Sequence, residues 1–130
     1  MDKNYINLFI ELTRATEVAA EQVMEYDKEK GDTKGFETAK LMRDDYAALH
    51  DKIKDKNFDG NLTKNEYAKL LAGAYIVKNN LQDKMTALKK AIQGYETDLI
   101  PKLTTIVEQG KTDEEAQKLA NDNLIIDSTK

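Results

Sequence analysis

The fold is decided by residues 3–54, which read KNYINLFIELTRATEVAAEQVMEYDKEKGDTKGFETAKLMRDDYAALHDKIK. In the first half of this stretch, steps of four and three residues lead along one mainly apolar series: Tyr5, Phe9, Leu12, Thr16, Ala19, Val23 and Tyr26. That spacing marks one face of an α-helix, and the charged residues lie on the other side. We therefore predict a helix over residues 3–30, which ends in the left-handed turn that Gly31 permits.

The same spacing returns after Gly31 and Asp32. The apolar positions of the second series are Phe36, Ala39, Met42, Tyr46, Leu49 and Ile53. They predict a second helix over residues 33–54 with one buried face. Because only two residues separate the helices, we expect them to form an antiparallel hairpin.

A third helix is predicted over residues 63–93. Thr63 and Glu66 have the spacing of a capping box, in which each side chain binds the backbone amide of the other residue. The apolar residues that follow keep one helical register: Tyr67, Leu70, Ala74, Val77, Leu81, Met85, Leu88 and Ile92. Such a helix is about 45 Å long at 1.5 Å per residue. It extends beyond its neighbours, which leaves room for a homodimer.

Gly94 and Pro101 divide the remaining sequence. We predict a break near Gly94 and a fourth helix over residues 98–109, with Asp98 as its cap and Pro101 in its first turn. The alternative is one long helix kinked at Pro101. Thr112 begins a short C-terminal helix over residues 113–122. Residues 1–122 are thus predicted to form a single all-α domain, an up-and-down antiparallel helical bundle, followed by a frayed tail at residues 123–130.

The composition argues against several classes of partner. The chain has 130 residues, a formal net charge of −4 and no cysteine. We expect no nucleic-acid partner and no membrane partner, because a protein with a net negative charge is not generally attracted to nucleic acid or to an anionic membrane surface. The absence of cysteine and of a long apolar run favours a cytoplasmic protein.

The segment between the second and third helices has the most specific local pattern. Residues 55–66 read DKNFDGNLTKNE, which fits D-x-[DN]-x-[DN]-G-x₅-E at every constrained position. This segment resembles the calcium-binding loop of the EF-hand family. The resemblance implies side-chain ligands at Asp55, Asn57 and Asp59, a backbone ligand at Asn61 and a bidentate carboxylate at Glu66. The other interpretation is an ordinary helix-to-helix turn, because Asn, Asp and Gly are typical turn residues.

The sequence contains no recognisable catalytic set. His50 is the only histidine, and no signature of a nucleophile accompanies it. We therefore expect a non-enzymatic protein that binds an unknown protein partner in a regulatory, inhibitory or scaffolding role. Tyr75 and Ile76 widen the apolar side of the third helix, which suits a binding face, a dimer contact or burial in the fold. The alternative function is a calcium-binding module that uses the loop at residues 55–66.

Overall fold

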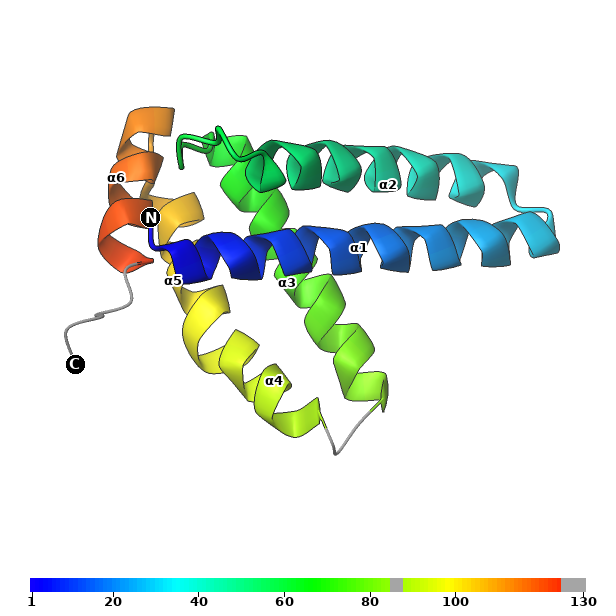
Figure 1. The fold of residues 1–130 in the computed structure, drawn as a ribbon. Helices are drawn as coiled ribbons and strands as arrows, with labels where there is room; N and C mark the ends of the chain where they lie inside the picture. Colours follow the sequence, from blue (N-terminus) through cyan, green and yellow to red (C-terminus); the bar gives the residue numbers. More distant parts are fainter. Residues whose placement is uncertain (85–87, 125–130) are drawn as a thin grey trace.

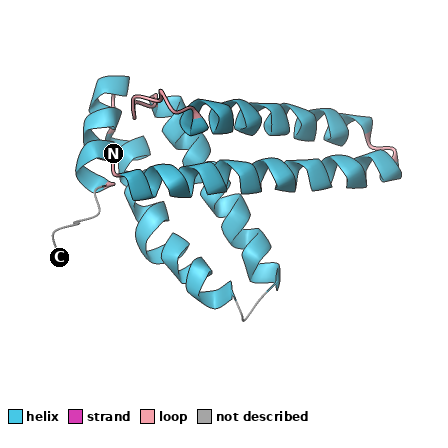
Figure 2. Ribbon diagram, viewed as in Figure 1, coloured by secondary structure: helices cyan, strands magenta, loops and turns pink. Residues whose placement is uncertain are grey.

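The protein is mainly helical in the part that the computed structural model describes, residues 1–84 and 88–124. No strand occurs in these residues, so the predicted all-α fold is confirmed (Figures 1 and 2). The elements in chain order are α1 (Lys3–Lys30), α2 (Thr33–Lys54), α3 (Lys64–Lys84), α4 (Lys89–Gly94), the π-helix η2 (Tyr95–Leu99), α5 (Ile100–Gln109) and α6 (Asp113–Asn123).

The first two helices form the predicted antiparallel hairpin with the predicted bounds (Figure 1). Gly31 adopts the left-handed conformation with φ 74°, and its amide donates to the Lys28 carbonyl at 3.2 Å. The Asp32 amide donates to the Asp27 carbonyl at 2.8 Å. These two bonds satisfy carbonyls at the end of α1, as in a Schellman motif. Asp32 then caps α2 by accepting a hydrogen bond from the Gly35 amide.

The third helix is shorter than predicted. α3 ends at Lys84 and α4 begins at Lys89, so the prediction of one helix over residues 63–93 is wrong. Met85, which we placed on the apolar face, lies outside the described residues. The Lys78 ammonium lies 3.5 Å from the Glu96 carboxylate, whereas 18 residues of continuous helix would separate them by about 27 Å. The chain therefore reverses direction, and the long overhang that left room for a homodimer does not exist.

The predicted break near Gly94 is also wrong. α4, η2 and α5 follow one another without an intervening non-helical residue, and a wide π-turn precedes Pro101. In this turn the Ile100 amide donates to the Tyr95 carbonyl, five residues earlier. A proline ring clashes with the carbonyl four residues before it in an α-helix, and the wider turn relieves that contact.

Asp98 is consequently not a helix cap but a link between two helices. Its carboxylate accepts a hydrogen bond from the Tyr5 hydroxyl at 2.8 Å and pairs with the Lys102 ammonium at 2.7 Å. Lys102 also donates to the Tyr5 hydroxyl at 2.9 Å. These contacts fasten the start of α1 to the π-turn and to α5.

The core lies between the first half of α1, the end of α2, α3, α5 and α6. α3 runs obliquely past the hairpin (Figure 1), and Gly73 lies in close contact with it. A methyl group on Gly73 would lie 2.9 Å from the Thr16 hydroxyl and 3.2 Å from the Tyr46 ring. The large side chains that are almost completely buried include Phe9, Leu12, Ile53, Tyr67, Leu70, Leu103, Ile106 and Leu124.

α6 closes the core at the end where the N-terminus lies (Figure 1). Thr112 caps it as predicted, since its hydroxyl accepts from the Glu115 amide at 3.1 Å. The frayed tail was predicted to begin too early, because Asn123 belongs to α6 and the Leu124 side chain is fully buried. Residues 125–130 of that tail lie outside the described part. Among the helices described, none combines the length and apolarity that crossing a bilayer requires.

Candidate functional site

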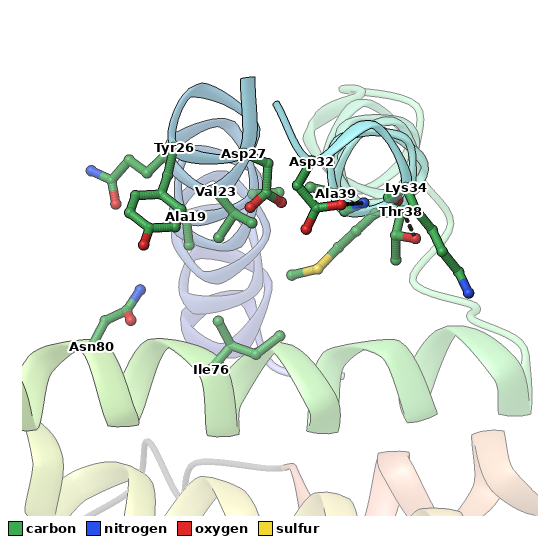
Figure 3. A pocket seen from close by; sticks show the side chains of 14 residues that line it. Ala19, Val23, Tyr26, Asp27, Asp32, Lys34, Thr38, Ala39, Ile76 and Asn80 are labelled. Carbon is green, nitrogen blue, oxygen red and sulfur yellow. Dashed lines mark hydrogen bonds between the residues drawn. The ribbon is translucent and has the colours of Figure 1, made fainter. Parts of the chain in front are cut away.

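An open groove lies between the outer halves of α1 and α2, near the α1–α2 turn (Figure 3). It has a volume of about 830 Å³, and α3 contributes Ile76 and Asn80 to its floor. The other lining residues come from the hairpin: Ala19, Ala20, Gln22, Val23, Tyr26, Asp27, Asp32, Lys34, Gly35, Thr38, Ala39 and Met42. The volume is within the range of about 300–1,000 Å³ that is typical of binding sites.

Two side chains of the groove, Val23 and Tyr26, are not buried as predicted. We placed Val23 and Tyr26 on the buried face of the first helix, but their exposed fractions are 49% and 60%. Ala20 and Met24 are buried on this part of α1 instead. The physical reason is the oblique course of α3, which reaches the groove only with Ile76 and Asn80 and does not cover Val23 and Tyr26 (Figure 1).

Several residues that line the groove have small side chains. Ala19 and Ala20 on α1, with Gly35 and Ala39 on α2, do not fill the space between the two helices and α3. Ile76 rises from the floor toward Val23, while Tyr26 and Asn80 point toward one another at one side (Figure 3). The result is an apolar surface with a few polar groups along its edge, which is the usual composition of a binding site.

Tyr75 and Ile76, which widen the apolar side of the third helix, lie in two different environments. Ile76 belongs to the groove, whereas Tyr75 is 45% exposed and lies outside it. The Lys78 ammonium lies 5.7 Å from the centre of the Tyr75 ring, a cation–π contact that accounts for part of the exposed ring.

The loop at residues 55–66 is organised mainly by hydrogen bonds to its own backbone. The Asp55 carboxylate accepts from the Asn57 amide, and the Asp59 carboxylate accepts from the Asn61 amide, both at 2.8 Å. Gly60 has φ 85° and supplies the sharp bend. Such Asp-to-backbone contacts are typical of turns.

Glu66 forms the predicted capping box. Its carboxylate accepts from the Thr63 amide at 2.9 Å, and the Thr63 hydroxyl accepts from the Glu66 amide at 3.1 Å. The same carboxylate oxygen pairs with the Lys52 ammonium at 2.7 Å. Burial alone would raise the pKa of Glu66, but the hydrogen bonds from Lys52 and Thr63 outweigh it and hold the pKa below its ordinary value.

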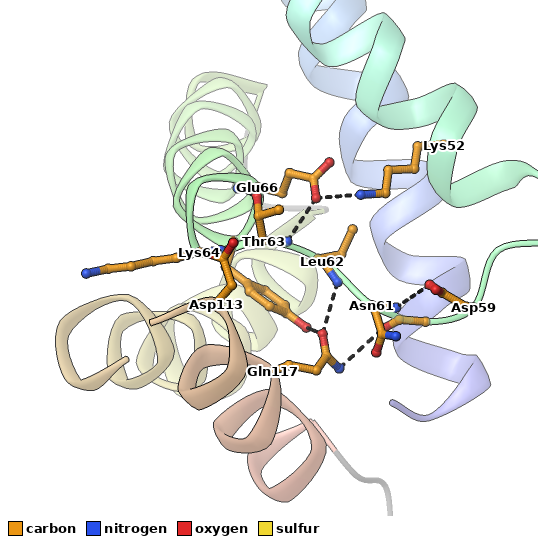
Figure 4. A network of polar contacts seen from close by, with 11 residues as sticks. Lys52, Asp59, Asn61, Leu62, Thr63, Lys64, Glu66, Asp113 and Gln117 are labelled. Carbon is orange, nitrogen blue, oxygen red and sulfur yellow. Dashed lines mark hydrogen bonds and ion pairs between the residues drawn. The ribbon is translucent and has the colours of Figure 1, made fainter. Parts of the chain in front are cut away.

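α6 fixes the end of this loop (Figure 4). The Gln117 side chain accepts from the Leu62 amide at 2.9 Å and donates to the Gly60 carbonyl at 3.2 Å. The Asp113 carboxylate accepts from the Lys64 amide at 3.0 Å. In residues 1–84 and 88–124, no group of three Asp, Glu or His side chains gathers that could hold a metal ion. The structure thus arranges Asp55, Asp59 and Glu66 as parts of a capped turn.

His50 contributes to packing between the first two helices. Its Nδ1 atom lies 3.1 Å from both the Thr13 hydroxyl and the Ile10 carbonyl. A carbonyl only accepts, and Thr13 donates its own proton to Phe9. The network therefore assigns the proton to Nδ1.

Fold and site together define a helical bundle with an open apolar groove at one end. Comparison with protein-family models, with curated proteins and with solved structures found no match. The functional argument therefore rests on the groove and its chemistry.

Proposed function

We propose that this protein is a non-enzymatic binding protein whose groove between α1 and α2 receives an amphipathic helix of another protein. The observation that carries the proposal is the exposure of Val23 and Tyr26 in a groove whose exposed lining is mainly apolar. Exposed apolar surface of this kind marks interaction sites, and grooves between helices commonly bind the apolar face of a further helix. A regulatory, inhibitory or scaffolding role is compatible with such a contact.

A helix suits the groove because of how the fold buries the rest of the hairpin. On the inner half, α3 packs against α1, and the small Gly73 permits close contact with Thr16 of α1 and Tyr46 of α2. On the outer half, Ala19, Ala20 and Ala39 leave space at the corresponding place. A partner helix there would insert side chains spaced three and four residues apart, as an ordinary neighbouring helix does.

The proposal is tested by affinity capture from the native cell with three proteins: the wild type, Val23→Glu and the control Leu41→Glu. Leu41 is on the same hairpin, is 69% exposed and lies outside the groove. Both variants replace an exposed apolar side chain by glutamate, so their general effects on solubility and helix formation are matched. We expect a partner that the wild type and Leu41→Glu retain and that Val23→Glu loses.

Amide hydrogen exchange of the captured complex identifies the occupied surface. Amides of residues 19–26 and 35–42 should exchange more slowly when the partner is bound, while those around Leu103 should not change. A partner that all three proteins retain, or protection elsewhere on the molecule, would contradict the proposal. Light scattering adds a further control, since a dimer that Val23→Glu dissociates would assign the groove to a second copy of the chain.

A further inference from the structure

Two carboxylates close the end of the groove that lies next to the α1–α2 turn. Asp27 belongs to the last turns of α1, and Asp32 is the N-cap of α2 (Figure 3). One oxygen of each approaches the same point beside Gly35: a methyl group there would be 2.6 Å from Asp27 and 2.7 Å from Asp32. The second Asp32 oxygen accepts from the Gly35 amide at 2.9 Å.

Gly35 leaves room for both carboxylates. It is the third residue of α2, and its φ is not positive, so its backbone conformation does not require glycine. An alanine methyl group at this position would displace the ends of the Asp27 and Asp32 side chains.

The two acids have no cationic partner within the protein as described. Across residues 1–84 and 88–124, no lysine or arginine nitrogen forms an ion pair with Asp27 or Asp32, whereas Glu66, Glu96 and Asp98 are all paired. Lys34 also lines the groove, but its side chain extends away from the two acids (Figure 3). The positive end of the α2 dipole makes two neighbouring carboxylates tolerable, and a cation between them would stabilise both.

From this charge arrangement, and resting on the proposed function, we infer that the partner helix is basic and places a lysine or arginine between Asp27 and Asp32. The apolar stripe of the helix fills the groove, while the cation fixes its position along the hairpin. An arginine has the better geometry, because its guanidinium can donate to two carboxylates at once. The net charge of −4 of the whole chain also favours the approach of a basic segment.

The test is a displayed library of helical 18-residue peptides. Apolar residues occupy positions spaced three and four apart, and all other positions, including both ends, are random. Peptides are selected on the wild type and then sorted by whether Val23→Glu abolishes binding. Among the peptides that depend on the groove, we expect enrichment of lysine or arginine near one end.

The double variant Asp27→Asn, Asp32→Asn measures the contribution of charge. Asparagine keeps the capping acceptor, so α2 retains its N-cap. We expect cationic peptides to bind this variant about tenfold more weakly, and their affinity for the wild type to fall as salt is raised. If the double variant loses its helical circular dichroism, Asp27→Asn alone, which leaves the Asp32 cap unchanged, replaces it.

The outcomes separate the two proposals. Peptides that need the groove but show no cationic preference, and bind the asparagine variants unchanged, would overturn the charge inference and leave the proposed function standing. A selection that yields no peptide dependent on Val23 would overturn both.

Discussion

Replacing Gly73 by alanine should destabilise the protein, although alanine is the better helix former. The added methyl group would lie 2.9 Å from the Thr16 hydroxyl and 3.2 Å from the Tyr46 ring. Neither neighbour is free to move, because the Thr16 hydroxyl is bonded to the Leu12 carbonyl and the Tyr46 hydroxyl to the Lys69 carbonyl. The methyl group therefore forces apart α3 and the hairpin.

The expected size of the effect follows from three contributions. Helix propensity favours alanine by about 1 kcal/mol, while overpacking of a tight contact costs about 1–3 kcal/mol. Weakening of the Tyr46 hydrogen bond adds about 1 kcal/mol to the cost. We expect a net loss of about 1–3 kcal/mol in the free energy of unfolding.

Gly94→Ala is the matched control for this measurement. Gly94 is helical with φ −59° and ψ −42°, and a methyl group there meets no atom within 4 Å. Only the propensity gain applies, so this variant should be more stable than the wild type by about 1 kcal/mol. Urea unfolding should place the wild-type midpoint between those of the two variants, with similar slopes. Equal stabilisation by both substitutions would refute the close approach at Gly73.

Three further predictions concern the loop and the N-terminal link. Glu66→Gln should lower the free energy of unfolding at neutral pH by about 1 kcal/mol. Because the pKa of Glu66 is lowered in the folded state, its contribution is complete above the unfolded-state pKa and is lost as pH falls through the folded-state pKa. The variant should thus lose less stability than the wild type on acidification, and an identical loss would contradict the ion pair with Lys52. Millimolar Ca²⁺ should leave the melting temperature of the wild type unchanged; a rise that Glu66→Gln removes would support the EF-hand interpretation instead. Tyr5→Phe removes the hydrogen bond to Asp98 and should cost about 1 kcal/mol in urea unfolding; unchanged stability would show that this bond does not contribute.

The sequence predicts those parts of the fold that local interactions determine. The first hairpin follows from apolar spacing and from Gly31, both of which act within a few residues, and the Asp32 cap found in the structure is local as well. The caps at Thr63 and Thr112 are local in the same sense, and both are observed. Their side chains need only their own helix to find a partner, so the sequence suffices.

The chain reversal after α3 could not be predicted from the apolar pattern. Leu81, near the end of α3, and Tyr95, beyond α4, pack against the same core from two antiparallel segments. The 14 residues from Leu81 to Tyr95 correspond to whole helical turns, so the two residues share one register. The sequence alone therefore does not distinguish two antiparallel segments from one long helix. The π-turn before Pro101 was hidden for a similar reason, because the helix continues by widening its hydrogen-bond spacing.

The groove depends on the crossing of helices, which is a property of the whole fold. Val23 and Tyr26 continue the apolar series of Tyr5, Phe9 and Leu12, so the spacing predicts that all five side chains are buried. Only the direction of α3 decides which part of that series is covered. The available signal was Gly73, a glycine inside an apolar helix next to Ala74, which is typical of a close helix contact.

The crossing at Gly73 should therefore also control binding in the groove. Ile76 lies on α3 one turn beyond Gly73 and forms part of the groove floor, so a shift of α3 moves this side chain relative to Val23. We expect Gly73→Ala to weaken the binding of groove-dependent peptides even where circular dichroism shows the variant to be fully folded, whereas Gly94→Ala should bind them normally. Isothermal titration at a temperature well below both melting transitions separates this effect from unfolding. Equal affinity of the two variants would mean that the position of the groove floor does not depend on how closely α3 approaches the hairpin.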